Sequence, residues 1–384
     1  MASIAKRANG QYRARYRDSG GKEHSRHFAR KADAQRWLDE VTTSVVTGQY
    51  VDPKAGRVTF REYAERWRVG QVHRPSSLAH VESVMRWHAY PFFGDKPMSS
   101  ILPSEIQAWV KRLSTGVPSE KRRPLAPKMV GVIHSIVSAV FKAAVRDRRI
   151  VANPCAGTKL PRVERQRVVP PTTAEVEMLV RLLPDELKAV VTFCAGTGVR
   201  QGECMGLTVD RIDFLRREVH IERQLRTVDE LGRPVFGPPK TDASVRTIPL
   251  PQVVVDSLAH HLAHHPPGEH GLVFTLEGRP ITRSPWGHVW RPIARQVGLP
   301  WGTGLHSLRH YYASLLIRHG ESVKTVQARL GHATAAETLD TYSHLWPDSD
   351  DRTREAVDSV WASRALGSPG FETVASATSS TTGG

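Results

Sequence analysis

The sequence predicts a multidomain, mainly α-helical protein with two small β-sheets. Residues 12–17 alternate arginine with tyrosine or alanine, which is the period of a half-buried strand. Between residues 59 and 146, apolar side chains recur at helical spacing. After residue 172 the pattern stays mainly helical but is interrupted by two strand-like segments, 218–223 and 245–250. We therefore expect a three-stranded sheet with one helix, then an all-α domain, then a mainly α domain containing a small sheet.

The N-terminal module is predicted to span residues 1–55, including a linker that begins at residue 43. A turn at residues 18–21 connects the strand at 11–17 to a returning strand at 23–28, and a helix near residues 32–41 covers one sheet face. The opposite face is then expected to carry a basic stripe. This stripe consists of Arg13, Arg15, Arg17 and Arg26. A solvated face is the simpler interpretation, but a row of cations favours DNA contact.

The second domain is predicted to be all-α and to span residues 56–160. Thr59 and Glu62 form a capping-box pattern that starts its first helix, and further helices are expected at 77–89, 104–113 and 127–146. The third domain follows from residue 165 to 366 and ends in an amphipathic helix at 351–366. Residues 367–384 are rich in Ser, Thr and Gly, which predicts a disordered tail.

The charge balance indicates a polyanionic partner. The 384 residues include 54 Lys and Arg against 38 Asp and Glu, a formal net charge of +16. Such an excess speeds encounters with nucleic acid, although a basic surface without a specific partner remains the alternative. The odd number of cysteines, three, matches neither a disulfide framework nor a zinc ribbon. With no signal peptide and no apolar run near 18 residues, we expect a cytoplasmic protein.

Isolated motifs do not support a cofactor or a metal. Gly196 and Gly198 suggest a dinucleotide loop, but the third glycine is Gly202, one residue beyond the required spacing. His306 and His310 have a spacing that zinc can use, yet an arginine lies between them and no glutamate does. The four histidines at 260, 261, 264 and 265 are interpreted as a solvated helix face.

Five short motifs in one order are more informative together. They are GVRQGE at 198–203, a lysine at 240 between the two strand-like segments, HSLR at 306–309, LGH at 330–332 and a tyrosine at 342. In this order the chain resembles the tyrosine recombinase family, also called phage-type integrases. The resemblance extends to the N-terminal module, which is similar to arm-type DNA-binding domains, and to the helical domain, which is similar to core-binding domains.

The resemblance implies a role for each matching residue. Arg200 and Arg309 would clamp the scissile phosphate, His306 would act as base, His332 would donate to the phosphate, and Lys240 would protonate the leaving 5′-oxygen. Tyr342 would be the nucleophile, and Glu203 would orient one of these groups. Ser307 replaces the usual aspartate, which should tune activity. Tyr311 and Tyr312 are rival phenols, interpreted as helix-packing or DNA-backbone residues, while His310 and His344 are auxiliaries without an assigned role.

The implied function is site-specific recombination of double-stranded DNA through a 3′-phosphotyrosine, which would integrate a mobile element, most simply a phage, into a host chromosome. No metal or nucleotide cofactor is implied. Implied partners are three further copies in a tetramer, a host bending factor and an excision factor, in the bacterial cytoplasm at the nucleoid. A type IB topoisomerase-like enzyme and a non-catalytic DNA-binding regulator are the alternatives.

Overall fold

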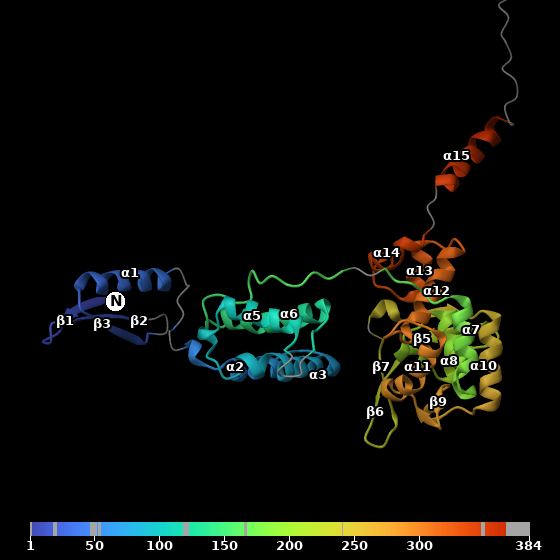
Figure 1. Ribbon diagram of the computed structural model, residues 1–384, viewed down its shortest axis with the longest axis horizontal. Coiled ribbons are helices and arrows are strands. Elements are labelled where there is room, and N and C mark those ends of the chain that lie inside the picture. The colour runs from blue at the N-terminus through green and yellow to red at the C-terminus, as the bar shows by residue number, and fades with distance from the viewer. Residues whose placement is uncertain are drawn as a thin grey trace, which may run out of the picture. The chain divides into compact units, whose positions relative to one another are not determined.

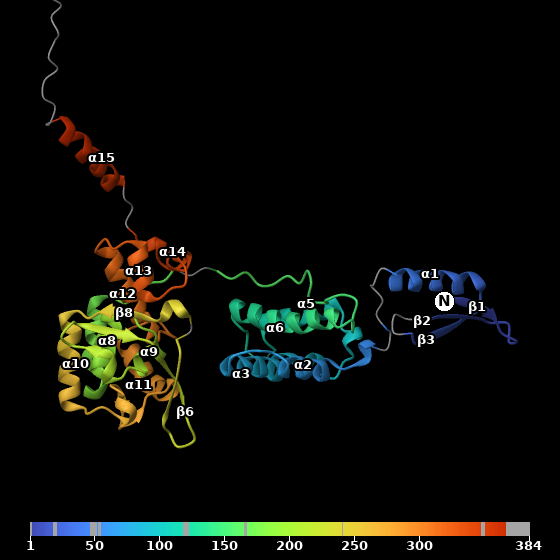
Figure 2. The same cartoon turned by 180° about the vertical axis from the view of Figure 1, so that it is seen from behind.

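The computed structural model describes residues 2–17, 21–46, 52, 55–117, 123–164, 167–239, 241–346 and 350–365. The chain divides into two compact units, Met1–Arg165 and Gln166–Gly384. Figures 1 and 2 present them from opposite sides. The predicted tail at 367–384, Lys240 and most of the predicted first turn lie outside the described residues.

The N-terminal module is a three-stranded antiparallel sheet with one helix across a face (Figure 1). Its elements are β1 (Ser3–Lys6), β2 (Tyr12–Arg17), β3 (Glu23–Phe28) and α1 (Lys31–Val46). Ala14 and Tyr16 of β2 pack against Ala34 and Leu38 of α1 because alternate residues of a strand point to one face. The predicted strands are confirmed. The predicted start of the linker at residue 43 is wrong, since α1 continues to Val46.

Strand register corrects the composition of the basic stripe. Arg26 pairs with Ala14, and cross-strand partners point to the same face of a sheet. The side chain of Arg26 therefore leaves the sheet on the face that α1 covers. Its guanidinium lies 5.3 Å from the centre of the Phe28 ring. The prediction that Arg26 lies in the stripe is wrong, because one strand's periodicity cannot give the register of the next.

The remaining stripe is a cluster of three arginines around one carboxylate. Arg13, Arg15 and Arg17 share the opposite face with Glu23, at nitrogen–oxygen distances of 3.6, 3.9 and 4.0 Å. Exposed pairs of this kind stabilise a fold little, so the three cations stay available to an external anion.

The helical domain is organised around α6. Its helices are α2 (Phe60–Val69), α3 (Pro75–Val84), α4 (Tyr90–Phe93), α5 (Pro103–Thr115) and α6 (Pro127–Arg146), with a π-helical stretch at Met85–Ala89. The capping box predicted at Thr59 and Glu62 is present. Phe60, Trp109 and Phe141 are among its fully buried side chains, and their rings pack on other aromatic rings of the core. The predicted helices are confirmed.

Helix α6 is long and apolar, although the sequence analysis found no apolar run near 18 residues. Among the described residues it is the helix that is long and apolar enough to cross a membrane, with a mean hydropathy of 1.5. One of its faces nevertheless forms the core of the helical domain. The buried residues are Val130, Ile133, Val137, Val140, Phe141 and Ala144. This packing is that of the core helix of a globular domain.

The C-terminal unit is built around α8. Helices α7, α10 and α12 pack against α8, whose residues are buried on several sides. The helices are α7 (Thr173–Leu182), α8 (Asp185–Thr197), α9 (Gln201–Met205), α10 (Gln252–His264), α11 (Arg283–Val297), α12 (His306–Arg318), α13 (Val323–Leu330), α14 (Ala335–Tyr342) and α15 (Asp350–Ala365). The predicted C-terminal helix is confirmed as α15, and its Val357, Val360 and Trp361 are each more than half exposed.

In the described part of this unit, the strands form three small sheets. They are β4 (Ile212–Asp213), β5 (Glu218–Ile221), β6 (Gln224–Val228), β7 (Pro234–Gly237), β8 (Arg246–Pro249), β9 (Thr275–Leu276) and β10 (Arg279–Pro280). The two predicted strands pair as β5 and β8. The β6–β7 hairpin between them was not predicted, and Figure 2 shows it extending from the body of the unit.

Candidate active site

Arg200 is positioned by a tight turn between α8 and α9. Gly198 ends α8 with a φ of +64°, and a Cβ there would lie 2.4 Å from the Tyr312 ring, so glycine is required. The chain then turns so that Arg200 precedes α9, and Glu203 accepts from its backbone N–H at 2.9 Å and its Nη1 at 2.8 Å. The glycine and glutamate of the GVRQGE segment thus fix the arginine between them.

Glu203 joins Arg200 to a second arginine that the sequence analysis missed. Its carboxylate, 2% exposed, also accepts from Arg246 Nη2 at 2.9 Å. Arg246 in turn donates to the backbone oxygens of Arg329 and Ser244, both at 2.8 Å. Burial opposes ionisation of Glu203, but Arg246 and then Arg200 outweigh it and hold the pKa of the carboxyl below its usual range. Glu203 thus holds Arg200 and Arg246 together, a contact that fits the supporting role predicted for it.

Arg309 is buried at the centre of the cluster. Only 2% exposed, it donates from Nη1 to the backbone oxygen of Gly198 at 2.8 Å. Burial, and then the positive charges of Arg200 and Arg246, lower the pKa of Arg309 to about 10. Among the described residues that meet here, three guanidinium groups face a single carboxylate, Glu203. This excess of positive charge, with Arg309 buried and Arg200 and Arg246 half-buried, suits an incoming phosphodiester.

Tyr342, the last residue of α14, is turned into the protein. It is 1% exposed and packs with Tyr312, Val326 and Leu330. Its hydroxyl oxygen lies 2.8 Å from Nδ1 of His310. Burial, partly offset by Arg309, raises the pKa of Tyr342 to about 12. The polar surroundings inferred from the adjacent residues are not what the phenol contacts, because the helix turns those neighbours towards solvent.

The LGH segment connects Arg200 to Tyr342. Gly331 ends α13 with a φ of +65°, and its backbone oxygen accepts from Arg200 Nη2 at 3.1 Å. Next to it, His332 has its Nδ1 2.8 Å from the Thr338 hydroxyl, and its ring stacks on Tyr342 with centroids 6.4 Å apart. Burial, followed by Arg309, lowers the pKa of His332 to about 4.

Helix α12 begins with the HSLR segment, in which His306 contacts a neighbouring ring and Ser307 donates to the backbone. His306 is reached by solvent, and its ring meets that of His310 edge to face at 4.8 Å. Its pKa is lowered, first by desolvation from surrounding atoms and then by Arg309 and Arg200. Ser307, in place of the usual aspartate, donates to the backbone oxygen of Gly304 at 2.9 Å and stabilises the first turn.

The rival phenols and the last unassigned histidine have packing contacts. The Tyr311 hydroxyl lies 3.1 Å from that of Thr173, and Tyr312 is buried, in agreement with the helix-packing interpretation. His344 lies 2.8 Å through Nε2 from the backbone oxygen of Val168.

Lys240 lies outside the described residues, and the structure describes the chain again from Thr241, close to the arginine cluster. The hydroxyls of Thr241 and Ser244 lie 2.9 Å apart, and Ser244 accepts from Arg200 Nη1 at 2.9 Å. Residues that immediately follow Lys240 are thus tied to Arg200.

Three family models match successive parts of the chain. They are described as phage integrase, N-terminal domain (residues 2–47), phage integrase, N-terminal SAM-like domain (59–114), and phage integrase family (172–348). The chain belongs to the phage integrase family. Among its curated relatives is the putative prophage phiRv2 integrase of Mycobacterium tuberculosis, 27% identical over 88% of this chain and 89% of the relative. A tyrosine recombinase XerC-like protein of Caldanaerobacter subterraneus is 26% identical over 90% and 94%.

Solved integrase structures share the fold. The Tn1549 transposon integrase aligns with a TM-score of 0.66 and 22% identity, covering 79% of this chain and 99% of the other. A lambda integrase dimer aligns with a TM-score of 0.56 and 19% identity, covering 90% and 96%. The predicted family and fold class are therefore confirmed.

One histidine of α10 is buried in this integrase. His261 is 3% exposed and lies 2.9 Å through Nε2 from the backbone oxygen of Val273, so the solvated-face interpretation is wrong for this residue. It packs on Phe274 instead. Within the described ranges, no group of three or more His, Cys, Asp or Glu side chains could hold a metal ion.

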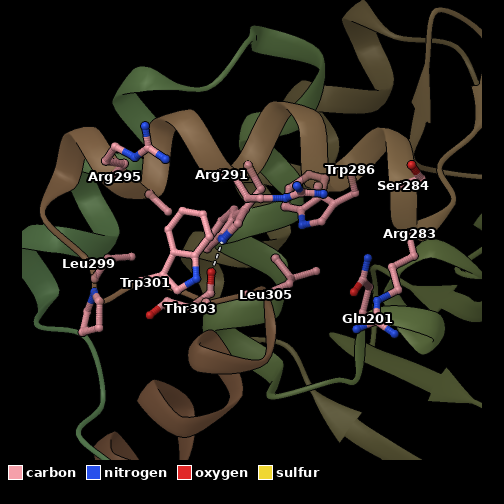
Figure 3. A pocket seen from close by; sticks show the side chains of 16 residues that line it. Gln201, Arg283, Ser284, Trp286, Arg291, Arg295, Leu299, Trp301, Thr303 and Leu305 are labelled. Atoms are coloured by element: carbon pink, nitrogen blue, oxygen red, sulfur yellow. Dashed lines mark hydrogen bonds between the residues drawn. The ribbon is translucent and has the colours of Figure 1, made fainter. Parts of the chain in front are cut away.

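A groove beside α11 is a second feature that the sequence analysis of the integrase missed. This α11 groove is a cavity of about 620 Å³ between α11 and residues 299–305 (Figure 3). Trp290 donates from Nε1 to the backbone oxygen of Thr303 at 2.8 Å, and Arg295 lies 5.6 Å from the exposed Trp301 ring. Gln201, the neighbour of Arg200, lines the groove together with three arginines of α11, which are Arg283, Arg291 and Arg295.

Proposed function

We propose that this integrase cuts and rejoins double-stranded DNA at specific sites through a covalent 3′-phosphotyrosine on Tyr342, and so integrates a mobile element, most simply a phage, into a bacterial chromosome. The observation that supports this most strongly is the cluster of Arg200, Arg246 and Arg309, together with the electrostatic effect of Arg309 on the Tyr342 phenol. The positive charge of these arginines is not balanced by Glu203 alone, and a bound phosphodiester would balance it. The phosphorus of that phosphodiester would be the atom that the Tyr342 oxygen attacks.

In the proposed reaction the Tyr342 oxygen attacks phosphorus and the bond from phosphorus to the 5′-oxygen breaks. Arg200 and Arg309 donate to the nonbridging oxygens as charge builds, and loss of one such clamp costs on the order of 10² to 10³ in rate. His332 and His306 are proposed to act at the phosphate, and Lys240 to protonate the leaving 5′-oxygen. The phosphotyrosine conserves the energy of the broken bond, so rejoining requires no ATP.

The nucleophile must lose its proton during attack. With the pKa of Tyr342 at about 12, only about 10⁻⁵ of the phenol is ionised at pH 7. A base in contact with the hydroxyl oxygen is therefore part of the proposal. The sequence analysis expected His306 to be this base. In the structure the ring of His306 contacts the ring of His310, and His310 is hydrogen-bonded to the Tyr342 hydroxyl.

Three surfaces are proposed to bind DNA. They are the stripe of Arg13, Arg15 and Arg17, the helical domain, and the α11 groove, whose arginines and exposed Trp301 combine charge with a stacking surface. A solved lambda integrase forms a tetramer bound to a Holliday junction. We extend that arrangement to this chain, with the exposed apolar side chains of α15 docking on a neighbouring copy. A host bending factor and an excision factor, at the bacterial nucleoid, complete the proposal.

The test is recombination between two plasmids that carry the attachment sites, mapped from the ends of the integrated element. The proposal expects joint molecules only when both sites are present. Relaxation of supercoiled plasmid irrespective of any site, without strand exchange, would instead identify a topoisomerase-like enzyme. Tight binding to both sites with neither reaction would support a non-catalytic regulator.

A further inference from the structure

The hydroxyl of Tyr342 has a neighbour that the family motifs do not assign. A buried hydroxyl requires a hydrogen-bond partner. In the described part of the chain, the partner of the Tyr342 hydroxyl is Nδ1 of His310, at 2.8 Å. The ring of His306 meets the ring of His310 instead, at 4.8 Å. His332 lies face to face with the Tyr342 ring and uses its Nδ1 for Thr338.

We propose that His310 is a catalytic residue, the base that takes the proton of Tyr342 as the phenol attacks the phosphate. This inference rests on the proposed function, in which Tyr342 is the nucleophile. In the step, the O–H bond of Tyr342 breaks and the proton passes to Nδ1 of His310. The oxygen's electron pair forms the bond to phosphorus, and the 5′-oxygen leaves with a proton from the general acid. In religation the proton returns from His310 to Tyr342.

The surroundings of His310 keep it neutral until DNA is bound. Burial and the nearby His306, Arg309 and His332 lower the pKa of His310 to about 4. A neutral imidazole that carries its proton on Nε2 offers the Nδ1 lone pair to the phenol. A phosphodiester bound to Arg309 adds negative charge beside the ring, which favours the protonated form at the moment of transfer.

The fold holds His310 in place for this role. It is half-buried on α12, one residue after the fully buried Arg309, so the backbone that anchors the arginine also positions the histidine. Its ring packs edge to face on both His306 and Tyr342, at interplanar angles of 84° and 66°. Proton acceptor and nucleophile therefore come from two different helices, α12 and α14, that meet only in the folded domain.

The experiment measures the single-turnover rate of covalent adduct formation on saturating nicked attachment-site DNA, between pH 6 and 9. The variants are His310→Ala and His310→Asn, since an asparagine oxygen can accept a hydrogen bond near the Nδ1 position but takes up no proton. His319→Asn, at an exposed residue directly after the same helix, is the matched control. We expect both His310 variants to react about 10² to 10⁴ times more slowly than the wild type, the usual contribution of general-base catalysis. Their rates should rise with pH as hydroxide replaces the base, while the control reacts as the wild type does.

A second substrate separates the nucleophile from the leaving group. When sulfur replaces the bridging 5′-oxygen, the leaving thiolate needs no proton, because thiols are far more acidic than alcohols. The His310 variants should remain slow on this DNA. The assignment would be overturned if the sulfur-containing DNA restored the rates of the His310 variants to that of the wild type. It would also be overturned if His310→Asn reacted within about threefold of the wild-type rate. Equal rates for the wild type and His310→Ala would overturn it too, whereas an absent adduct in the wild type would refute the proposed function itself.

Discussion

Replacing Glu203 with glutamine removes the buried carboxylate that Arg200 and Arg246 share. In the folded protein this group, 2% exposed, accepts from Arg200 at 2.8 Å and from Arg246 at 2.9 Å. Removing one member of a buried ion pair costs about 3–5 kcal/mol. Glutamine preserves the volume and one acceptor oxygen, so we expect the free energy of unfolding to fall by the lower end of that range, about 3 kcal/mol. At about 2–4 °C per kcal/mol for a domain of this size, the unfolding temperature should fall by about 6–12 °C.

The same change should alter the dependence of stability on pH. The pKa of Glu203 is held below its usual range in the folded state by Arg246 and Arg200, against the effect of burial. Its contribution is therefore fully present above the unfolded pKa, about 4.3, and is lost as pH falls through the lower folded value. The difference in unfolding temperature between the wild type and Glu203→Gln should shrink as pH falls below about 4.

Calorimetry from pH 3 to 8 measures both effects, with Glu177→Gln on the exposed surface of α7 as the control. The control should stay within about 0.5 kcal/mol of the wild type. If Glu203→Gln unfolds at the temperature of the control, or if its deficit is the same at every pH, the buried network does not stabilise the domain as argued.

Three further changes test neighbouring parts of the site. Arg309→Lys retains the charge but loses the planar fork, so adduct formation should slow by about 10² or more at unchanged DNA affinity; a rate within threefold of the wild type would contradict the phosphate clamp. Gly331→Ala would place a Cβ 2.9 Å from a backbone oxygen, whereas Gly320→Ala, also at positive φ, meets nothing within 4 Å. Backbone strain should lower the free energy of unfolding of both variants by about 1 kcal/mol. The steric contact should lower it further in Gly331→Ala alone and slow its reaction with DNA, as denaturant titration and adduct assays would reveal. His310 and His332 have folded pKa values of about 4, below the unfolded value of about 6.5, so the unfolded state binds more protons between these limits. Stability should therefore fall as pH is lowered from 6.5 to 4, and His310→Asn should flatten the curve; identical curves would exclude this linkage.

The candidate site residues came from the family resemblance, whose matching residues stand in short segments of the sequence. In GVRQGE, the glycine that permits a left-handed turn and the glutamate that accepts from the arginine lie within three residues of Arg200. The capping box at Thr59 is equally local. The capping box was predicted from spacing alone, whereas the role of Glu203 beside Arg200 was implied by the resemblance.

The parts that sequence analysis missed depend on how distant segments meet. The face on which Arg26 lies is set by its pairing with Ala14, and Arg246 reaches Glu203 from a strand more than forty residues away. The contact between His310 and Tyr342 joins α12 to the end of α14, between residues 32 positions apart in the sequence. The β6–β7 hairpin was missed because its strands, Gln224–Val228 and Pro234–Gly237, contain few alternating apolar residues.

Covalent trapping tests the central claim most directly. The wild type and Tyr342→Phe are each incubated, in EDTA, with nicked DNA that carries the attachment site. The account predicts a denaturation-resistant protein–DNA adduct with the wild type and none with Tyr342→Phe. An adduct formed by Tyr342→Phe, or no adduct from the wild type on a site that it binds, would contradict it.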